Sequence, residues 1–191
     1  FVLMGCILEK SGVAEQLFDA VYVWSGRLRG GLAIGTIIAC VAMAAMVGIV
    51  GAEIVTFGLI ALPQMLSRGY DKNLALGCIT SGGGMATLIP PSIVFIVYGM
   101  TAGVSIGDLF IAGIIPGLLL ATLFVGYIMF SVWRRPHLAP AASEEERNIP
   151  LRKKLQMLKG LIMPALITLA VLGSIYVGIA TPTEAAAIGC L

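Results

Sequence analysis

The stretch that decides the fold is Ser81-Gly82-Gly83-Gly84-Met85-Ala86-Thr87-Leu88-Ile89-Pro90-Pro91, which lies inside the uncharged segment 73–107. Each of the three consecutive glycines costs roughly 1 kcal/mol relative to alanine in a helix interior. The two prolines remove two backbone hydrogen-bond donors. The segment therefore cannot form one regular helix, and we predict two half-helices, residues 74–80 and 92–100, joined by unwound backbone.

The composition places these half-helices in a lipid bilayer. Hydrophobic residues make up 59% of the chain and charged residues 12%, and the mean hydropathy is +1.01. Such a chain has too little polar surface to cover a soluble globule of its size. The net charge is only +2 and the cations form short patches between apolar runs, so we expect no nucleic-acid partner. We predict an all-α integral membrane protein, a polytopic helix bundle.

Uncharged runs of about 20 residues mark candidate membrane crossings. Residues 109–133 and 160–183 are two such runs, and each suits one crossing. The run 30–67 is longer and holds a single charge, Glu53, near its middle. We predict a helical hairpin there, with its tip at the small residues around Gly48.

The positions of Lys and Arg predict the orientation, because cytoplasmic loops retain these residues. Cations precede and follow the 30–67 hairpin, and seven of the twelve lie in residues 134–159. All three patches are therefore predicted to face the cytoplasm, which requires the hairpin to return to the side it left. A hairpin that crosses the membrane fully and returns satisfies this requirement, and so does a re-entrant hairpin that enters and leaves on the same side.

Residues 134–159 form an aqueous connection, since they contain three prolines and the run Glu144-Glu145-Glu146. Within it, Leu151, Leu155 and Leu158 fall at positions i, i+4 and i+7 among Lys and Arg. This spacing predicts a short amphipathic helix in the cytoplasmic interface of the membrane. A solvated linker is the alternative.

The unwound backbone is a candidate binding site, because peptide groups at membrane depth need protein, water or a ligand to satisfy them. Carbonyls freed between Gly82 and Thr87 can coordinate a small cation. The second half-helix, with proline at its first positions, presents the positive end of its dipole. Many secondary transporters bind substrate at such a break. The alternative is a packing kink, in which the glycines let a neighbouring helix approach.

Glu53 is a second candidate, because an unpaired carboxylate inside a membrane is costly and is a functional hypothesis by default. It could bind the cation or take a proton. The alternative is that the hairpin tip reaches water or protein partners.

The sequence argues against an enzyme. The paired aspartates of presenilin-like proteases must meet within the bilayer, whereas Asp71 and Asp108 lie at opposite ends of the 73–107 crossing. A serine or zinc protease needs a membrane histidine, and His137 lies in the aqueous loop. The cysteines have no CxxC spacing and are interpreted as small buried hydrophobes; they are Cys6, Cys40, Cys78 and Cys190.

Polar residues at the ends of predicted helices are interpreted as caps. Thr181, Pro182 and Glu184 have the spacing of a capping box with proline at the first helical position. Ser105 with Asp108, and Asp71, are interpreted in the same way.

Several motifs carry a resemblance to a known family. They are Gly69-Tyr70-Asp71, Leu88-Ile89-Pro90-Pro91-Ser92-Ile93, Ser105-Ile106-Gly107-Asp108-Leu109-Phe110 and Thr181-Pro182-Thr183-Glu184. In this order they resemble the large membrane subunit of the tripartite ATP-independent periplasmic (TRAP) transporters, over essentially the whole chain. The segment Gly48-Ile49-Val50-Gly51-Ala52 resembles the branch associated with mannitol or chloroaromatic compounds.

The resemblance implies a secondary active transporter subunit that imports small organic acids, coupled to a sodium gradient, in a prokaryotic inner membrane. Implied partners are a small TRAP membrane subunit and a periplasmic substrate-binding protein, and no cofactor is expected besides the coupling ion. The family is built from inverted repeats and moves its transport domain like an elevator. A membrane channel or scaffold subunit without ion coupling is the alternative.

The same resemblance divides the chain into five parts. We expect a partial scaffold helix and cytoplasmic turn at 1–29, the transport-domain hairpin and broken helix at 30–107, a transmembrane helix at 108–133, the cytoplasmic linker at 134–159 and the start of a second repeat at 160–191. Both ends of the chain lie in apolar runs, so we expect a fragment of a longer membrane protein.

The predicted cation and substrate site combines the hairpin tip with the break. Its residues are Gly48, Val50, Gly51, Glu53, Ser81, Gly82, Gly83, Gly84, Thr87, Pro90, Pro91 and Ser92. The family usually has Ser-Gly-Thr-Leu-Gly before the prolines, so the hydroxyl expected at Gly84 is missing here. Sodium is therefore expected on backbone carbonyls, with Ser81, Gly83 and Thr87 as candidates.

Overall fold

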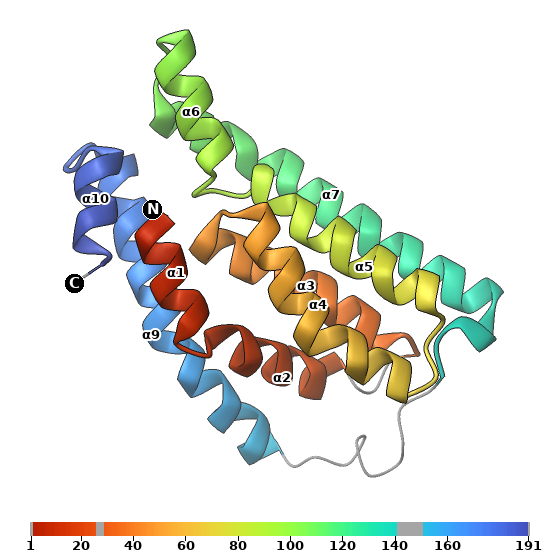
Figure 1. The fold of residues 1–191 in the computed structure, drawn as a ribbon. Helices are drawn as coiled ribbons and strands as arrows, with labels where there is room; N and C mark the ends of the chain where they lie inside the picture. Colours follow the sequence, from red (N-terminus) through yellow and green to blue (C-terminus); the bar gives the residue numbers. More distant parts are fainter. Residues whose placement is uncertain (1, 26–28, 141–150, 191) are drawn as a thin grey trace.

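The computed structural model describes residues 2–25, 29–140 and 151–190, and the regular structure within these ranges is helical (Figure 1). The elements are α1 (Val2–Lys10), α2 (Val13–Ser25), α3 (Gly31–Val47), α4 (Val50–Ser67), α5 (Lys72–Gly84), η1 (Met85–Thr87), α6 (Ile93–Ala102), α7 (Ile106–Arg134), η2 (Pro136–Leu138), α9 (Leu151–Tyr176) and α10 (Pro182–Ile188). The all-α prediction is confirmed for the described residues.

Helices α3 and α4 form the predicted hairpin. Gly48 connects them with φ 66°, a left-handed conformation that favours glycine, and its N–H donates to the carbonyl of Ala44. Gly51, predicted at the tip, lies instead in the first turn of α4. Nearly all of α3 is buried, because α1, α2, α4, α5 and α7 pack around it. The hairpin thus supplies the central helix of the bundle.

The first half of the broken helix is longer than predicted. Helix α5 continues through Ser81 to Gly84 and is followed by the 3₁₀ turn η1, so the predicted end at residue 80 is wrong. A Cβ atom on Gly82 would lie 2.8 Å from Cys40 Sγ, and one on Gly83 would lie 2.5 Å from Ile54 Cγ1. The glycines let α5 pack directly on α3 and α4, and this packing outweighs their low helix propensity.

The second half-helix, α6, begins at Ile93 with Ser92 as its N-cap residue. Pro90 and Pro91 precede the helix, so the prediction of prolines at its first positions is wrong. Two residues of unwound chain before the cap accommodate the missing donors without disturbing α6. The break of regular structure is therefore residues 88–92.

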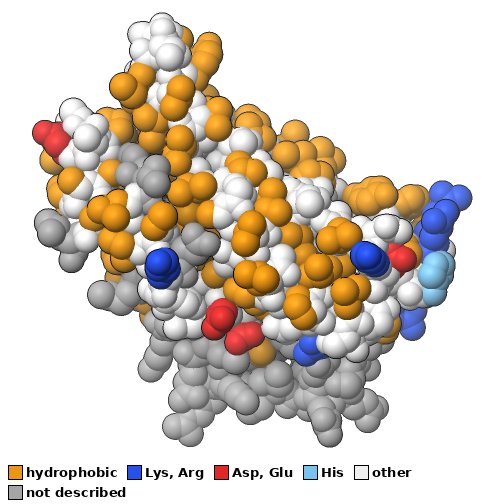
Figure 2. All heavy atoms as spheres, in the orientation of Figure 1, with side chains coloured by type: hydrophobic (Ala, Val, Ile, Leu, Met, Phe, Trp, Pro, Cys, Tyr) orange, Lys and Arg blue, Asp and Glu red, His pale blue; other side chains and the backbone are white. Residues whose placement is uncertain are grey.

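Two of the described helices, α4 and α7, are long and apolar enough to cross a membrane. Figure 2 shows hydrophobic side chains spread over the described part of this face, with few charged side chains among them. Helix α7 contains the predicted 109–133 crossing and exposes many large apolar side chains, Ile115, Leu119 and Tyr127 among them. These features agree with a membrane helix bundle.

The described cations of the three patches belong to segments that meet at one end of the bundle, as a hairpin that returns to its starting side requires; they are Arg29, Arg68, Lys72, Arg134 and Arg135. The backbone N–H of Asp71 donates to the carbonyl of Leu138 at 3.0 Å, which joins the start of α5 to the segment after α7. Gly30, beside the first patch, contacts Val132 near the end of α7. The hairpin therefore returns to the end from which it starts.

Helix α9 joins two elements that were predicted to be separate. Residues 151–176 form one helix, which combines the predicted amphipathic segment with most of the 160–183 run. The helix continues through Gly160 and Pro164, which lie at and just after the predicted boundary. The interfacial placement of Leu151, Leu155 and Leu158 lies outside the described side chains, and residues 141–150 lie outside the described chain.

The predicted caps are confirmed. The Asp71 carboxylate accepts hydrogen bonds from the N–H groups of Asn73 and Leu74 at 2.9 and 3.1 Å, and Ser105 caps α7. Thr181 and Glu184 form the capping box of α10. The hydrogen bonds from Thr181 hold the pKa of the exposed Glu184 carboxylate below its usual value.

Candidate functional site

The hairpin tip touches the break of the discontinuous helix. Gly48 is buried against Pro91, and a Cβ atom on Gly48 would overlap the Pro91 carbonyl. The left-handed φ of Gly48 allows the same close approach of backbone to backbone. The sequence places these residues 43 positions apart, and the fold brings the two predicted halves of the site into direct contact.

Hydroxyl groups in and next to the break donate hydrogen bonds to backbone carbonyls that precede it. Ser92 is fully buried, and its hydroxyl donates to the carbonyl of Thr87 at 2.8 Å. The Thr87 hydroxyl donates to the carbonyl of Gly84 at 2.9 Å. The carbonyls of Gly82 and Gly83 accept from the N–H of Met85. The prediction that carbonyls between Gly82 and Thr87 are freed is therefore wrong for those that accept hydrogen bonds from backbone N–H groups or from the two hydroxyls, which are the carbonyls of Gly82, Gly83, Gly84, Met85 and Thr87.

The unwound segment is shifted toward the prolines. The N–H groups of Leu88 and Ile89 both donate to the carbonyl of Met85, at 2.9 and 3.0 Å. Beyond them lie Pro90 and Pro91, which have no N–H, and the peptide bond between them is cis. Within this segment the Pro91 carbonyl lies next to Gly48, whereas the Leu88 carbonyl faces Gly113 of α7 (Ile106–Arg134).

The predicted residues of α5 face different neighbours. Gly82 and Gly83 face α3 and α4, whereas a Cβ atom on Gly84 would meet no atom within 4 Å. Ser81 lines a cavity on another side of the helix. The structure therefore brings Thr87 and Ser92 to the break but separates Ser81 from Gly83.

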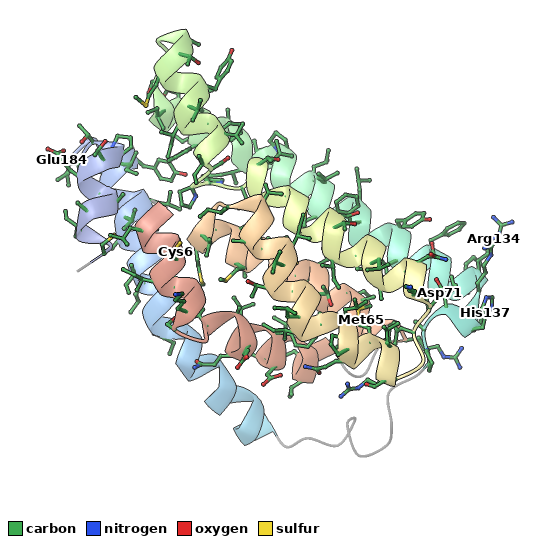
Figure 3. All side chains as sticks on the ribbon, in the orientation of Figure 1. Cys6, Met65, Asp71, Arg134, His137 and Glu184 are labelled. Atoms are coloured by element: carbon green, nitrogen blue, oxygen red, sulfur yellow. The ribbon has the colours of Figure 1, made fainter. Side chains whose placement is uncertain are left out.

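A cavity of about 1380 Å³ lies between α5 and α7. Its walls are mostly apolar, and its polar end lies where Asp71, Arg134 and His137 point outward (Figure 3). Of the predicted site residues only Ser81 lines it. Sequence reasoning missed this cavity, although cations after a long apolar run were a visible signal of a polar end.

Glu53 is enclosed by protein. It lies in the first turn of α4, with 2% of its surface exposed. Neither carboxylate oxygen has a hydrogen-bond partner in the described part of the chain. The alternative that the tip exposes Glu53 to water is therefore wrong in this conformation, since α3 and α5 pack over that face of α4.

The four cysteines differ in exposure. Cys40 and Cys78 are buried, as predicted, Cys190 is partly buried, and Cys6 on α1 is exposed, so the prediction of a buried side chain is wrong for Cys6. The electrostatic environment of Cys40 includes Glu53 and Cys78, so α3, α4 and α5 each contribute one of these side chains. The described residues contain no group of three His, Cys, Asp or Glu side chains that could hold a metal ion.

Comparison with known proteins gives one consistent result. The family model of the tripartite ATP-independent periplasmic transporter, DctM component, matches residues 1–191. The C4-dicarboxylate TRAP transporter large permease protein DctM of Pseudomonas aeruginosa is 37% identical over the whole chain, which covers 43% of that relative. The ectoine TRAP transporter large permease protein TeaC of Halomonas elongata is 37% identical over 98% of the chain and 42% of the relative.

A third relative is the 2,3-diketo-L-gulonate TRAP transporter large permease protein YiaN of Escherichia coli. It is 33% identical over 98% of the chain, which covers 43% of this relative. The chain thus spans less than half the length of these curated relatives.

Proposed function

Because this chain belongs to the DctM component family of the tripartite ATP-independent periplasmic transporters, we propose that it forms part of a large permease subunit that imports small organic acids by secondary active transport. The family assignment confirms the resemblance found in the sequence motifs. We further propose that the transport is coupled to a sodium gradient.

The contact between Gly48 and Pro91 is the observation that carries this proposal. A hairpin tip that meets a discontinuous helix places unwound backbone and a helix N-terminus together, the arrangement that secondary transporters use to bind ions and substrates. A ligand held between the two segments would respond to any movement of one against the other. A passive channel or scaffold has no need for this contact.

The substrate class is supported by the relatives and by the break. Two relatives are named for C4-dicarboxylates and for 2,3-diketo-L-gulonate, which are organic acids. The N-terminus of α6, beginning at Ile93, adjoins the break. The positive end of a helix dipole favours a carboxylate at such a position. We propose that substrate binds between this N-terminus and Gly48.

The coupling ion is proposed at the same place. Sodium prefers oxygen ligands, and the Pro91 carbonyl lies beside Gly48 at the hairpin tip, with the hydroxyl of Ser92, the next residue in the chain, bonded to the Thr87 carbonyl. Ser81 and Gly83 remain proposed ligands, and would join the others only in a conformation that turns both toward the ion.

The proposed assembly follows the family. It comprises this subunit, a small membrane subunit and a periplasmic substrate-binding protein in the inner membrane of a prokaryote, as a multi-pass system with inverted repeats and elevator-type movement. The apolar exposed surface of α7 supports a membrane location.

Reconstitution of the full-length permease in liposomes, with its small subunit and binding protein, tests the proposal. We expect saturable uptake of an organic acid that requires an inward sodium gradient and the binding protein, and counterflow when labelled substrate meets unlabelled substrate inside. Conduction without saturation or sodium dependence would support the channel alternative and overturn the proposal.

A further inference from the structure

Glu53 is a buried carboxylic group that finds no hydrogen-bond partner among the described residues. It is 2% exposed, and both of its oxygens lack a hydrogen-bond partner in the described part of the chain. The surrounding helices enclose it, so contacts from other parts of the protein have little surface left to reach. A carboxylate in such a place is normally neutralised or paired.

The titratable groups that face Glu53 offer no counter-charge. Helix α3 contributes the Cys40 thiol, which interacts electrostatically with Glu53 and with the Cys78 thiol of α5, and both thiols are buried. Helix α2 also packs against α4, but its carboxylic residues, Glu15 and Asp19, are exposed. The turn η1, the remaining neighbour of α4, has no titratable side chain.

A proton is the cation that this environment can accommodate. A metal cation such as sodium needs several oxygen ligands at once, and no group of three His, Cys, Asp or Glu side chains that could hold a metal ion occurs among the described residues. The backbone carbonyls of the surrounding helix interiors are engaged in helical hydrogen bonds. A proton needs only one carboxylate oxygen, and it removes the charge that burial penalises.

A route to water runs past the hairpin tip. Glu53 lies five residues after Gly48, whose contact with Pro91 closes the tip against the break. Gly51, two residues before Glu53, is already exposed. Separation of Gly48 from Pro91 would therefore loosen the first turn of α4 and admit water to the carboxyl group.

We propose that Glu53 is a proton-binding site that carries a proton through the transport cycle. Water gives up a proton and an O–H bond forms on the carboxylate when the tip opens. The bond persists while the group is enclosed, and it breaks when the proton returns to water on the other side. This inference rests on the proposed function, since only alternating access exposes the group to both sides in turn.

One test does not depend on transport. Infrared difference spectra of the full-length permease in lipid nanodiscs at neutral pH report the C=O stretch of protonated carboxylic groups. We expect this band to be present in the wild type, lost in Glu53→Gln and retained in Asp108→Asn, a matched change of an exposed carboxylate on α7. A spectrum that Glu53→Gln leaves unchanged would overturn the proposal.

A second test measures sodium-driven uptake as a function of pH in proteoliposomes. On the alkaline side, wild-type uptake should fall by about tenfold per pH unit, the slope of a single titrating group. The Glu53→Gln variant mimics the protonated group and should show no such decline, and a pH dye inside the liposomes should record proton entry only with the wild type. Asp108→Asn should follow the wild type.

The outcomes separate this inference from the proposed function. Sodium-driven uptake that is independent of pH in the wild type would remove Glu53 as a proton carrier and leave the transporter intact. Wild-type liposomes without sodium-driven uptake would defeat the proposed function instead, while the infrared result would still decide the protonation of Glu53. If Glu53→Gln fails to insert, Glu53→Asp keeps the carboxyl group and should shift the alkaline decline.

Discussion

The two halves of the broken helix are held in different ways. Helix α5 lies across the bundle, packed on α3 and α4 through Gly82 and Gly83. Helix α6 projects past the end of the bundle (Figure 1) and packs mainly against α7. Four of its large side chains are exposed; they are Val94, Val97, Tyr98 and Met100.

The helix starts differ in the same way. Asp71 caps α5 with two hydrogen bonds. Ser92, at the start of α6, makes no side-chain cap, and its hydroxyl donates back to Thr87 in the break. The break therefore joins a half that is anchored in the core to a half that is anchored to one neighbour. The position of the candidate site is set by α5 and the hairpin, while α6 has fewer contacts to lose if it moves.

The contact between the hairpin tip and the break that joins the two halves should be the most sensitive to substitution. In Gly48→Ala, the new Cβ would overlap the Pro91 carbonyl and strain a left-handed residue, at a cost of about 3 kcal/mol. We expect loss of sodium-driven uptake and a lower melting temperature of the full-length permease. Gly58→Ala in α4 is the control, because its Cβ would meet nothing within 4 Å. Normal uptake by Gly48→Ala would show that the tip need not touch the break.

The packing of α6 against α7 can be disturbed without substituting Gly48. A Cβ on Gly113 of α7 would overlap the Phe95 ring of α6 and lie 2.5 Å from the Leu88 carbonyl. We expect Gly113→Ala to cost about 2 kcal/mol and to reduce uptake. Labelling of the buried Cys40 by a membrane-permeable maleimide should not change, since α5 stays in place. Gly126→Ala, with open space around its Cβ, is the control.

A substitution that disturbs the packing of α5 against α4 should, by contrast, change the labelling of Cys40. A Cβ on Gly83 would meet Ile54 at Cγ1 and, at 3.2 Å, at the backbone nitrogen. Gly83→Ala should therefore push α5 away from α4 at a cost of about 1 kcal/mol and increase the labelling of Cys40. Gly77→Ala on the open side of α5 should leave labelling unchanged. Equal labelling of Cys40 in the Gly83 and Gly113 variants would remove the distinction between the two halves.

The smallest expected effect concerns the cap of α5. Asp71→Ala removes two hydrogen bonds from the helix start and should lower stability by about 1 kcal/mol. Asp71→Asn should restore most of this loss, because an amide oxygen can accept the same bonds. Thermal unfolding of the purified full-length permease measures both. A loss in Asp71→Asn as large as in Asp71→Ala would point to the charge and not the cap.

Local chemistry made part of this fold predictable from sequence. The caps at Asp71, Ser105 and Thr181 depend on residues three positions apart, and these predictions are confirmed. The hairpin within residues 30–67 followed from an apolar run too long for one crossing and a glycine at its centre. The Pro90-Pro91 pair correctly indicated a break, because no packing can restore two missing donors.

The glycines show where local reasoning fails. Their propensity predicted an open helix from Ser81, but the helix continues through Gly84. Propensity describes an isolated helix, whereas Gly82 and Gly83 contact residues some thirty to forty positions earlier in the chain. The carbonyls of Gly82 and Gly83, which were predicted to be free, accept a backbone hydrogen bond because the helix continues.

The sequence by itself determined the environment, the helical class, the caps and the existence of a break, since these depend on composition and on residues close in the chain. Only the tertiary structure decided where the helix opens, that Gly48 meets Pro91 and that Glu53 is enclosed without a hydrogen-bond partner in the described ranges. These features depend on the packing of α3, α4 and α5 against one another. Close packing of distant segments can exceed a local preference of about 1 kcal/mol per residue.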